Sequence, residues 1–131
     1  MSTLPRVVVL STGGTIAGRA DSTMNLTDYK AGALAGSELV DAVPELKQYA
    51  EVSVEQIANI GSSNMTIDVW RKLAMRIDEL FTSDNELAGV VITHGTSTIE
   101  ETAYFLNLTV RHERPVVLVG AQRPEIGRAH V

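Results

Sequence analysis

The sequence has 131 residues, 44% of them hydrophobic and 21% charged, which indicates one globular domain without a bilayer-spanning segment. Its net charge of -5, with no cluster of Lys or Arg, argues against binding to nucleic acid. The absence of cysteine excludes disulfides, thiolate catalysis and cysteine-ligated metals.

The first half of the chain predicts two strands, a long connection and a short helix. Residues 4–11 contain four consecutive apolar residues, as expected of a strand buried on both faces of a sheet. Residues 12–35 contain glycines and show no periodicity, and irregular connections of this length are more often functional than not. A helix over 36–43 stops at Pro44, and a second strand is expected over 51–60.

A long helix is expected to begin after Thr66. Thr66 can cap its first turn, and Asp68 places negative charge where the helix dipole favours it. The apolar residues that recur at helical spacing are Val69, Trp70, Leu73, Ile77, Leu80 and Phe81. They predict a face packed in the core, with Trp70 as its largest contributor.

The remaining elements complete an alternating pattern. A third strand is expected over 89–92, a helix over 98 to about 110, and a fourth strand over 115–119. Thr98 and Glu101 match a capping box, in which hydroxyl and carboxylate satisfy free amides of the first turn. The alternation predicts an α/β fold: a three-layer α/β/α arrangement with a mainly parallel, flavodoxin-like sheet.

Each of the four strands ends in a turn of small or hydroxyl-bearing residues, at 12–15, 61–64, 94–98 and 120–124. Open α/β sheets bind ligands beyond the carboxyl ends of their strands, so these turns are expected to form one rim. The first and third turns would direct two threonine hydroxyls into one cleft, which suggests an enzyme with threonine nucleophiles.

A hydroxyl nucleophile needs nearby backbone amides for an oxyanion and a partner that removes its proton. Gly13 and Gly14 allow close approach to Thr15, and Tyr29 is a candidate partner. Each feature also has a plain structural interpretation: the glycines as a tight turn, residues 61–64 as a helix entry, and Tyr29 as a surface aromatic residue.

The histidines do not predict a metal site. His94 at a strand end is expected to be a hydrogen-bonded structural residue, and His112 in a charged turn is expected to be exposed. Because the three histidines are scattered without paired ligand spacing, no metal is expected.

Together these motifs resemble those of the bacterial L-asparaginase family, especially its type II branch, from Arg6 to about Pro124. The matching segments are 12–18, 29–32, 59–62, 91–96, 100–106 and 115–124. The resemblance implies hydrolysis of L-asparagine to L-aspartate and ammonia, with L-glutamine as a slower substrate. It also implies a homotetramer that needs no cofactor or metal.

The resemblance assigns roles to individual residues. Thr15 is similar to the primary nucleophile, Tyr29 to a lid residue that helps activate it, and Thr96 to the second catalytic threonine. Ser62 is similar to the residue that binds the substrate α-carboxylate, and the amides of Gly95 and Thr96 would lie near the oxyanion. The full set implied to bind substrate is Gly14, Gly61, Ser62, Ser63, Gly95, Ser97 and, through its carbonyl, Ala121.

Two positions depart from the family pattern. Ser97 stands where the family usually has an aspartate that pairs with the substrate ammonium group, and Ser63 stands where many members have glutamine. A charge-assisted hydrogen bond is roughly twice as strong as a neutral one, so weaker binding of the α-amino group is expected.

The resemblance also implies an incomplete site. The family's catalytic lysine and C-terminal domain follow later in the polypeptide, so residues 1–124 are expected to be an incomplete N-terminal domain without activity of its own. Residues 125–131 depart from the family pattern, and 126–131 resemble a translated sequencing adapter, so a foreign tail is expected.

Other functions remain open from the sequence. A glutaminase-asparaginase and an asparaginase-like subunit of a tRNA-dependent amidotransferase share the enzyme class. A non-catalytic amino-acid-binding module is a further alternative, slightly favoured by Ser97. No signal peptide is visible, which favours a cytoplasmic protein, but a periplasmic parent is not excluded.

Overall fold

The computed structural model describes residues 4–17 and 35–122, which form a parallel four-stranded sheet in the order β2-β1-β3-β4. The strands are β1 (Arg6–Gly13), β2 (Glu51–Ile60), β3 (Leu87–Thr93) and β4 (Val116–Val119). The helices are α1 (Gly36–Asp41), α2 (Ile67–Ser83) and α3 (Ile99–Thr109), with 3-10 turns η1 (Thr15–Ala17), η2 (Pro44–Gln48) and η3 (Ser62–Asn64).

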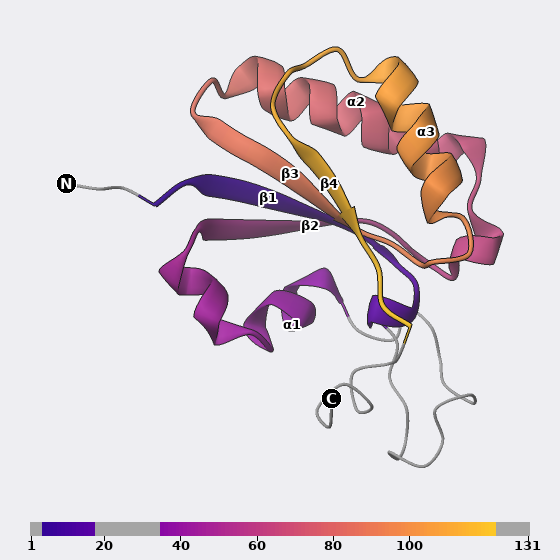
Figure 1. Cartoon of the computed structure of the whole chain (residues 1–131), viewed down its shortest axis with the longest axis horizontal. Coiled ribbons are helices and arrows are strands. Elements are labelled where there is room, and N and C mark those ends of the chain that lie inside the picture. Colours follow the sequence, from indigo (N-terminus) through magenta and orange to yellow (C-terminus); the bar gives the residue numbers. More distant parts are fainter. Residues whose placement is uncertain (1–3, 18–34, 123–131) are drawn as a thin grey trace.

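Helices cover both faces of the sheet, which confirms the three-layer prediction. Figure 1 shows α2 and α3 on one face and α1 with η2 on the other. The four consecutive apolar residues at 7–10 lie in β1, which has a neighbour on each side and is buried along most of its length. Parallel strands covered on both faces favour such continuous apolar runs over alternation.

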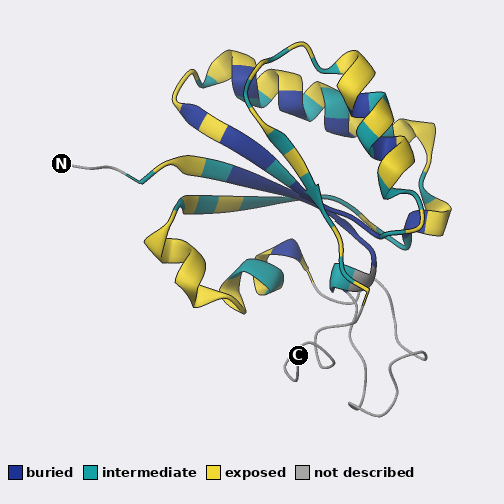
Figure 2. Ribbon diagram, in the orientation of Figure 1, coloured by how far each residue is buried: buried dark blue, intermediate teal, exposed yellow. Residues whose placement is uncertain are grey.

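The main core lies between the sheet and α2. Figure 2 shows buried residues along β1 and β3 and at intervals along α2. The buried cluster contains Val8, Leu10, Leu73, Ile77, Phe81, Leu87, Val90, Ile92 and Leu106. The prediction that Trp70 is the largest core contributor is wrong, because Trp70 is only half-buried and Phe81 is the largest fully buried side chain.

The ends of the helices agree only in part with the sequence prediction. The Thr66 hydroxyl accepts a hydrogen bond from the Val69 amide at 3.3 Å, which confirms that cap. The capping box at Thr98 and Glu101 is wrong, because Thr98 makes no side-chain cap. Its hydroxyl donates instead to the carbonyl of Ser62 at 2.8 Å, and this tertiary bond replaces the local one.

Several predictions concern residues outside the described ranges. Tyr29 lies there, as do most of the connection over 12–35 and the tail over 125–131, so these remain predictions. Within residues 4–17 and 35–122, no helix is both long enough and apolar enough to cross a membrane.

Candidate active site

The turn after β1 lies against the turn after β3. Gly13 and Gly14 have φ values of 105° and 81°, a region that side chains rarely adopt, and the Gly14 amide donates to the Ile60 carbonyl at 2.9 Å. A Cβ on Gly14 would lie 2.3 Å from the backbone nitrogen of Gly95. The backbone of Thr15, which begins η1, therefore follows a direct contact between the two turns.

The turn after β2 joins the same group. A Cβ on Gly95 would lie 2.5 Å from the hydroxyl oxygen of Ser62, so these two residues are also packed without spare room. The Ser62 hydroxyl is buried and accepts a hydrogen bond from the Ser97 amide at 3.1 Å. This bond occupies one lone pair of the hydroxyl, whose hydrogen can still be donated to an anionic ligand.

The turn after β4 completes the rim. A Cβ on Gly120 would lie 3.0 Å from Cγ2 of Thr96 and 3.0 Å from the carbonyl oxygen of His94. Thr96 and Ala121 are partly exposed at this edge, and Ser97 is exposed. The turns after all four strands thus meet at the carboxyl edge, as the sequence predicted.

Two predicted binding residues lie at the margin of this group. Ser63 is exposed, and a Cβ on Gly61 would meet only the Ser63 hydroxyl, at 3.9 Å. The packing around Gly61 therefore leaves room for a side chain, in contrast to Gly14 and Gly95.

His94 is fully buried directly behind the rim. Its Nδ1 lies 2.6 Å from the Gly95 carbonyl and its Nε2 lies 2.7 Å from the hydroxyl of Thr102, which confirms that His94 is a hydrogen-bonded structural residue. Burial lowers the pKa of His94, so the neutral imidazole is favoured. The Thr102 hydroxyl also accepts a bond from Nε1 of Trp70 at 2.7 Å.

Sequence reasoning missed this network and misjudged a second histidine. The only local sign of a role for Thr102 is that its hydroxyl lies on the buried face of α3, where a polar group needs a hydrogen-bond partner. His112, expected to be exposed, is half-buried. Its ring packs against Phe81, and its Nε2 lies 2.8 Å from a carboxylate oxygen of Asp78.

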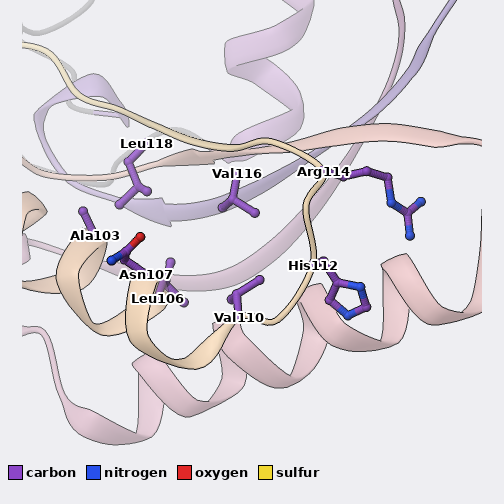
Figure 3. Close-up of a pocket in the computed structure, with 8 residues that line it drawn as sticks. All are labelled: Ala103, Leu106, Asn107, Val110, His112, Arg114, Val116 and Leu118. Carbon is purple, nitrogen blue, oxygen red and sulfur yellow. The ribbon is translucent and has the colours of Figure 1, made fainter.

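Pockets are present on both faces of the sheet, and the one under α1 is lined in part by Ile16, next to Thr15. Figure 3 shows one of about 250 Å3 between α3 and the edge of β4, lined in part by Leu106, Asn107 and Leu118. Another, of about 480 Å3 and largely apolar, lies under α1 on the opposite face of the sheet. Thr96 and Ser97 line neither pocket, so the convergence of the turns defines the candidate site.

The described residues do not provide an evident metal centre. Within 4–17 and 35–122, no group of three or more His, Asp or Glu side chains is placed to hold a metal ion. Hydroxyl groups, backbone amides and glycine contacts make up the described part of the rim.

A parallel α/β sheet whose carboxyl edge gathers glycine and hydroxyl turns defines a class of proteins that bind small molecules at that edge. The chain belongs to the asparaginase family: residues 6–127 match the family described as "Asparaginase, N-terminal".

Named relatives agree with this assignment. The chain is 54% identical over 121 residues to L-asparaginase 2 of Bacillus subtilis (strain 168), covering 92% of this chain and 32% of the relative. It is also 54% identical over 121 residues to a protein of Haemophilus influenzae (strain ATCC 51907 / DSM 11121 / KW20 / Rd) named "Probable L-asparaginase periplasmic", covering 92% and 34%.

A solved structure shares the fold. The crystal structure of a probable cytoplasmic L-asparaginase from Campylobacter jejuni matches with a TM-score of 0.89 and 55% identity, covering 93% of this chain and 37% of that chain. The chain thus spans about a third of the length of these relatives.

Proposed function

We propose that the chain is the N-terminal part of an enzyme that hydrolyses L-asparagine to L-aspartate and ammonia. One observation carries the proposal: in a member of the asparaginase family, the turns that precede Thr15 and contain Thr96 meet by direct backbone contact. Thr15 would be the nucleophile, activated with the help of Tyr29, and Thr96 would be the second catalytic threonine.

The same rim supplies groups for recognition of the substrate. Ser62 would donate its hydroxyl hydrogen to the α-carboxylate, and its contact with Gly95 and Ser97 would place the carboxylate beside the remaining groups. The backbone amides of Gly95 and Thr96 suit a developing oxyanion, because fixed amide donors stabilise negative charge in the transition state. Gly14, Gly61, Ser63 and the carbonyl of Ala121 would complete the proposed set.

A chimaera tests this function, because the relatives are about three times as long as the chain. Residues 6–122 would replace their counterparts in the B. subtilis relative, and ammonia release from L-asparagine and L-glutamine would be measured. We expect release from the chimaera and none above background from the 131-residue chain alone. Thr15→Val or Thr96→Val should lower kcat at least about 100-fold, whereas Thr109→Val, on the exposed side of α3, should not.

A folded chimaera, identified by circular dichroism and gel filtration, that releases no ammonia from either amide would contradict the proposal. Preferential activity with L-glutamine would support the glutaminase-asparaginase alternative. The comparisons do not favour the amidotransferase subunit or the non-catalytic module, since the B. subtilis, H. influenzae and C. jejuni relatives are all named as asparaginases.

Ser97 is expected to weaken substrate binding. A serine supplies no negative charge for the substrate ammonium group, and charge-assisted hydrogen bonds are the stronger kind. In the chimaera, Ser97→Asp should lower KM for L-asparagine about tenfold, equivalent to about 1.4 kcal/mol. An unchanged KM would contradict this role, and Ser83→Asp, at an exposed serine at the end of α2, serves as the control.

We further propose that the complete enzyme is a homotetramer and is cytoplasmic. The C. jejuni relative is named as cytoplasmic, which supports this location, whereas the H. influenzae relative is named as periplasmic. Light scattering of the complete enzyme and fractionation of its cells would decide these two points.

A further inference from the structure

A chain of hydrogen bonds leads from the outer helices to the rim. Nε1 of Trp70, in α2, lies 2.7 Å from the hydroxyl oxygen of Thr102, in α3. That oxygen lies 2.7 Å from Nε2 of His94, and Nδ1 of His94 lies 2.6 Å from the carbonyl oxygen of Gly95. His94 and Thr102 have no exposed surface, so water does not compete for these bonds.

Chemistry fixes the hydrogens along this chain. The indole Nε1 can only donate, so the Thr102 oxygen accepts from Trp70. The Gly95 carbonyl can only accept, so Nδ1 of His94 must carry a hydrogen. In a neutral imidazole Nε2 then has none and accepts, which leaves the Thr102 hydroxyl as its donor.

The neutral form is consistent with the surroundings. Burial lowers the pKa of His94, and this effect outweighs the opposing influences of the Gly95 carbonyl and the carboxylate of Glu101. The Gly95 carbonyl therefore requires the Nδ1–H tautomer, and Thr102 supports it by donating its hydroxyl hydrogen to the unprotonated Nε2.

The tautomer matters because Gly95 shares a peptide unit with Thr96. A trans peptide is planar, so fixing the direction of the Gly95 carbonyl turns the Thr96 amide N–H the opposite way, away from the His94 ring. Among residues 4–17 and 35–122, no protein group accepts a hydrogen bond from this N–H. It therefore remains available to a ligand at the rim.

We propose that Thr102 is a positioning residue that holds the ring of His94, in its Nδ1–H tautomer, and thereby directs the Thr96 amide N–H into the candidate site. This inference rests on the proposed function in one respect only: that function is what gives the Thr96 amide its role beside the oxyanion. Trp70 orients the Thr102 hydroxyl, and its ring is stacked on Phe105 with centroids 5.2 Å apart and planes at 24°.

Nitrogen-15 NMR of the 131-residue chain tests the tautomer directly. The unaltered chain should show His94 protonated at Nδ1 and not at Nε2. Thr102→Val removes the donor to Nε2, so the ring loses one of its two hydrogen bonds, and the His94 Nε2 and Thr96 amide resonances should both shift. Thr102→Ser should restore both signals, and Thr109→Val, on the same helix with its hydroxyl bonded to the Phe105 carbonyl, should change neither.

Other results would overturn the proposal. An Nε2–H tautomer in the unaltered chain would do so, as would unchanged His94 Nε2 and Thr96 amide resonances in Thr102→Val. Should Thr102→Val fail to fold, Trp70→Phe provides a second probe, because it removes only the donor to Thr102. We expect Trp70→Phe to keep the Nδ1–H tautomer but to shift the Thr96 amide resonance less than Thr102→Val would, and a switch to Nε2–H would refute the assigned direction.

Activity of the chimaera separates this proposal from the proposed function. There, Thr102→Val should lower kcat about tenfold with little change in KM, and Thr102→Ser should recover it. Unchanged kcat in an active chimaera would overturn the positioning role. An inactive unaltered chimaera would instead contradict the proposed function, while the NMR result would still decide the tautomer.

Discussion

At the scale of single residues, the contact between Gly14 and Gly95 sets how closely two turns of the rim approach. The nearest atom to the place where a Cβ would stand is 2.3 Å away for Gly14 and 2.5 Å away for Gly95, well inside van der Waals contact. Gly14 also has a positive φ of 81°. Both the conformation and the space therefore require glycine at position 14.

Gly14→Ala should lower the free energy of unfolding by about 3 kcal/mol, because strain at a positive φ and overpacking each contribute. Urea unfolding followed by circular dichroism measures this change. Gly61→Ala is the matched control, since Gly61 has a φ of -67° and open space. It should change stability by less than about 0.5 kcal/mol, and equal effects of the two substitutions would contradict our interpretation.

His94 makes stability dependent on pH. Burial lowers its pKa in the folded chain below the value of about 6.5 expected when unfolded, so the unfolded state binds more protons in this range. The free energy of unfolding should therefore fall as the pH decreases from 7.5 to 5.5. Arg76 lowers the pKa of Glu55, and that contribution is lost only at more acidic pH.

Urea unfolding at pH 7.5 and 5.5 measures this change in the free energy of unfolding. His94→Gln should make the change smaller, whereas His112→Gln should keep the contribution of His94 to it. A chain that is more stable at pH 5.5, or equally stable at both values, would be inconsistent with a buried neutral His94.

Single residues also show how far the sequence could predict the site. The prediction brought Ser62, Gly95 and Ser97 to one rim, and the structure places them in mutual contact. It could not show that Ser62 accepts from the Ser97 amide, because that bond joins two turns far apart in the chain. Roles of Thr15, Tyr29 and the substrate-binding residues remain predictions.

At the scale of elements, Arg114 ties the end of α2 to the sheet. Its guanidinium donates to the carbonyls of Asp84 at 2.6 Å and Leu87 at 3.0 Å, and also to that of Phe81. Its Cζ lies 4.3 Å from the centroid of the Phe81 ring. One planar cation thus satisfies carbonyls that a helix leaves free at its C-terminus.

Arg114→Lys should lower the free energy of unfolding by about 1 to 3 kcal/mol, because an ammonium group cannot reproduce the planar fork or its contact with the ring. Thermal unfolding measures the change. Arg71→Lys is the control, since Arg71 is mostly exposed and lies 3.9 Å from Asp68 in a weak pair. A loss of stability no larger than that of the control would contradict the role assigned to Arg114.

The elements themselves were largely predictable because their signals are local. The cap at Thr66 and the apolar spacing of α2 act within one turn or a few turns, and both are present in the structure. The failed capping box at Thr98 has a tertiary cause: the Thr98 hydroxyl bonds to the carbonyl of Ser62, in a distant segment, and this bond overrides the local preference. Trp70 likewise bonds to another helix, through Thr102.

At the scale of the whole molecule, apolar surface remains exposed along β4. Among the described residues β4 pairs only with β3, and Val117 is 48% exposed. Val117 lines an apolar hollow with Val7 and Val91. Unpaired strand edges and contiguous apolar surface favour association between molecules.

The 131-residue chain should therefore associate as its concentration increases, and Val117→Lys should shift sedimentation towards the monomer. Met75→Lys is the control, because Met75 is 62% exposed but lies on α2 away from the sheet edge. Sedimentation velocity at several concentrations measures both variants. A monomer at all concentrations, or equal effects of the two substitutions, would refute this role for β4.

The class of fold could be predicted from the sequence, because it depends on the alternation of strands and helices along the chain and on strands that are apolar along their whole length. The strand order could not, since no local pattern states which strands are neighbours. The meeting of the four turns was predictable from the general position of sites in parallel sheets. Their closeness was not, because it depends on glycine contacts between different turns.

The order β2-β1-β3-β4 also has a consequence for synthesis of the protein. The strand made first lies between two partners made later, and Val8 in it pairs with Ser53 on one side and Val90 on the other. Until residue 90 has left the ribosome, β1 cannot pair with β3, and its backbone hydrogen-bonding groups on that side are exposed to solvent. Slow translation before β3 would lengthen that exposure and increase the need for chaperones.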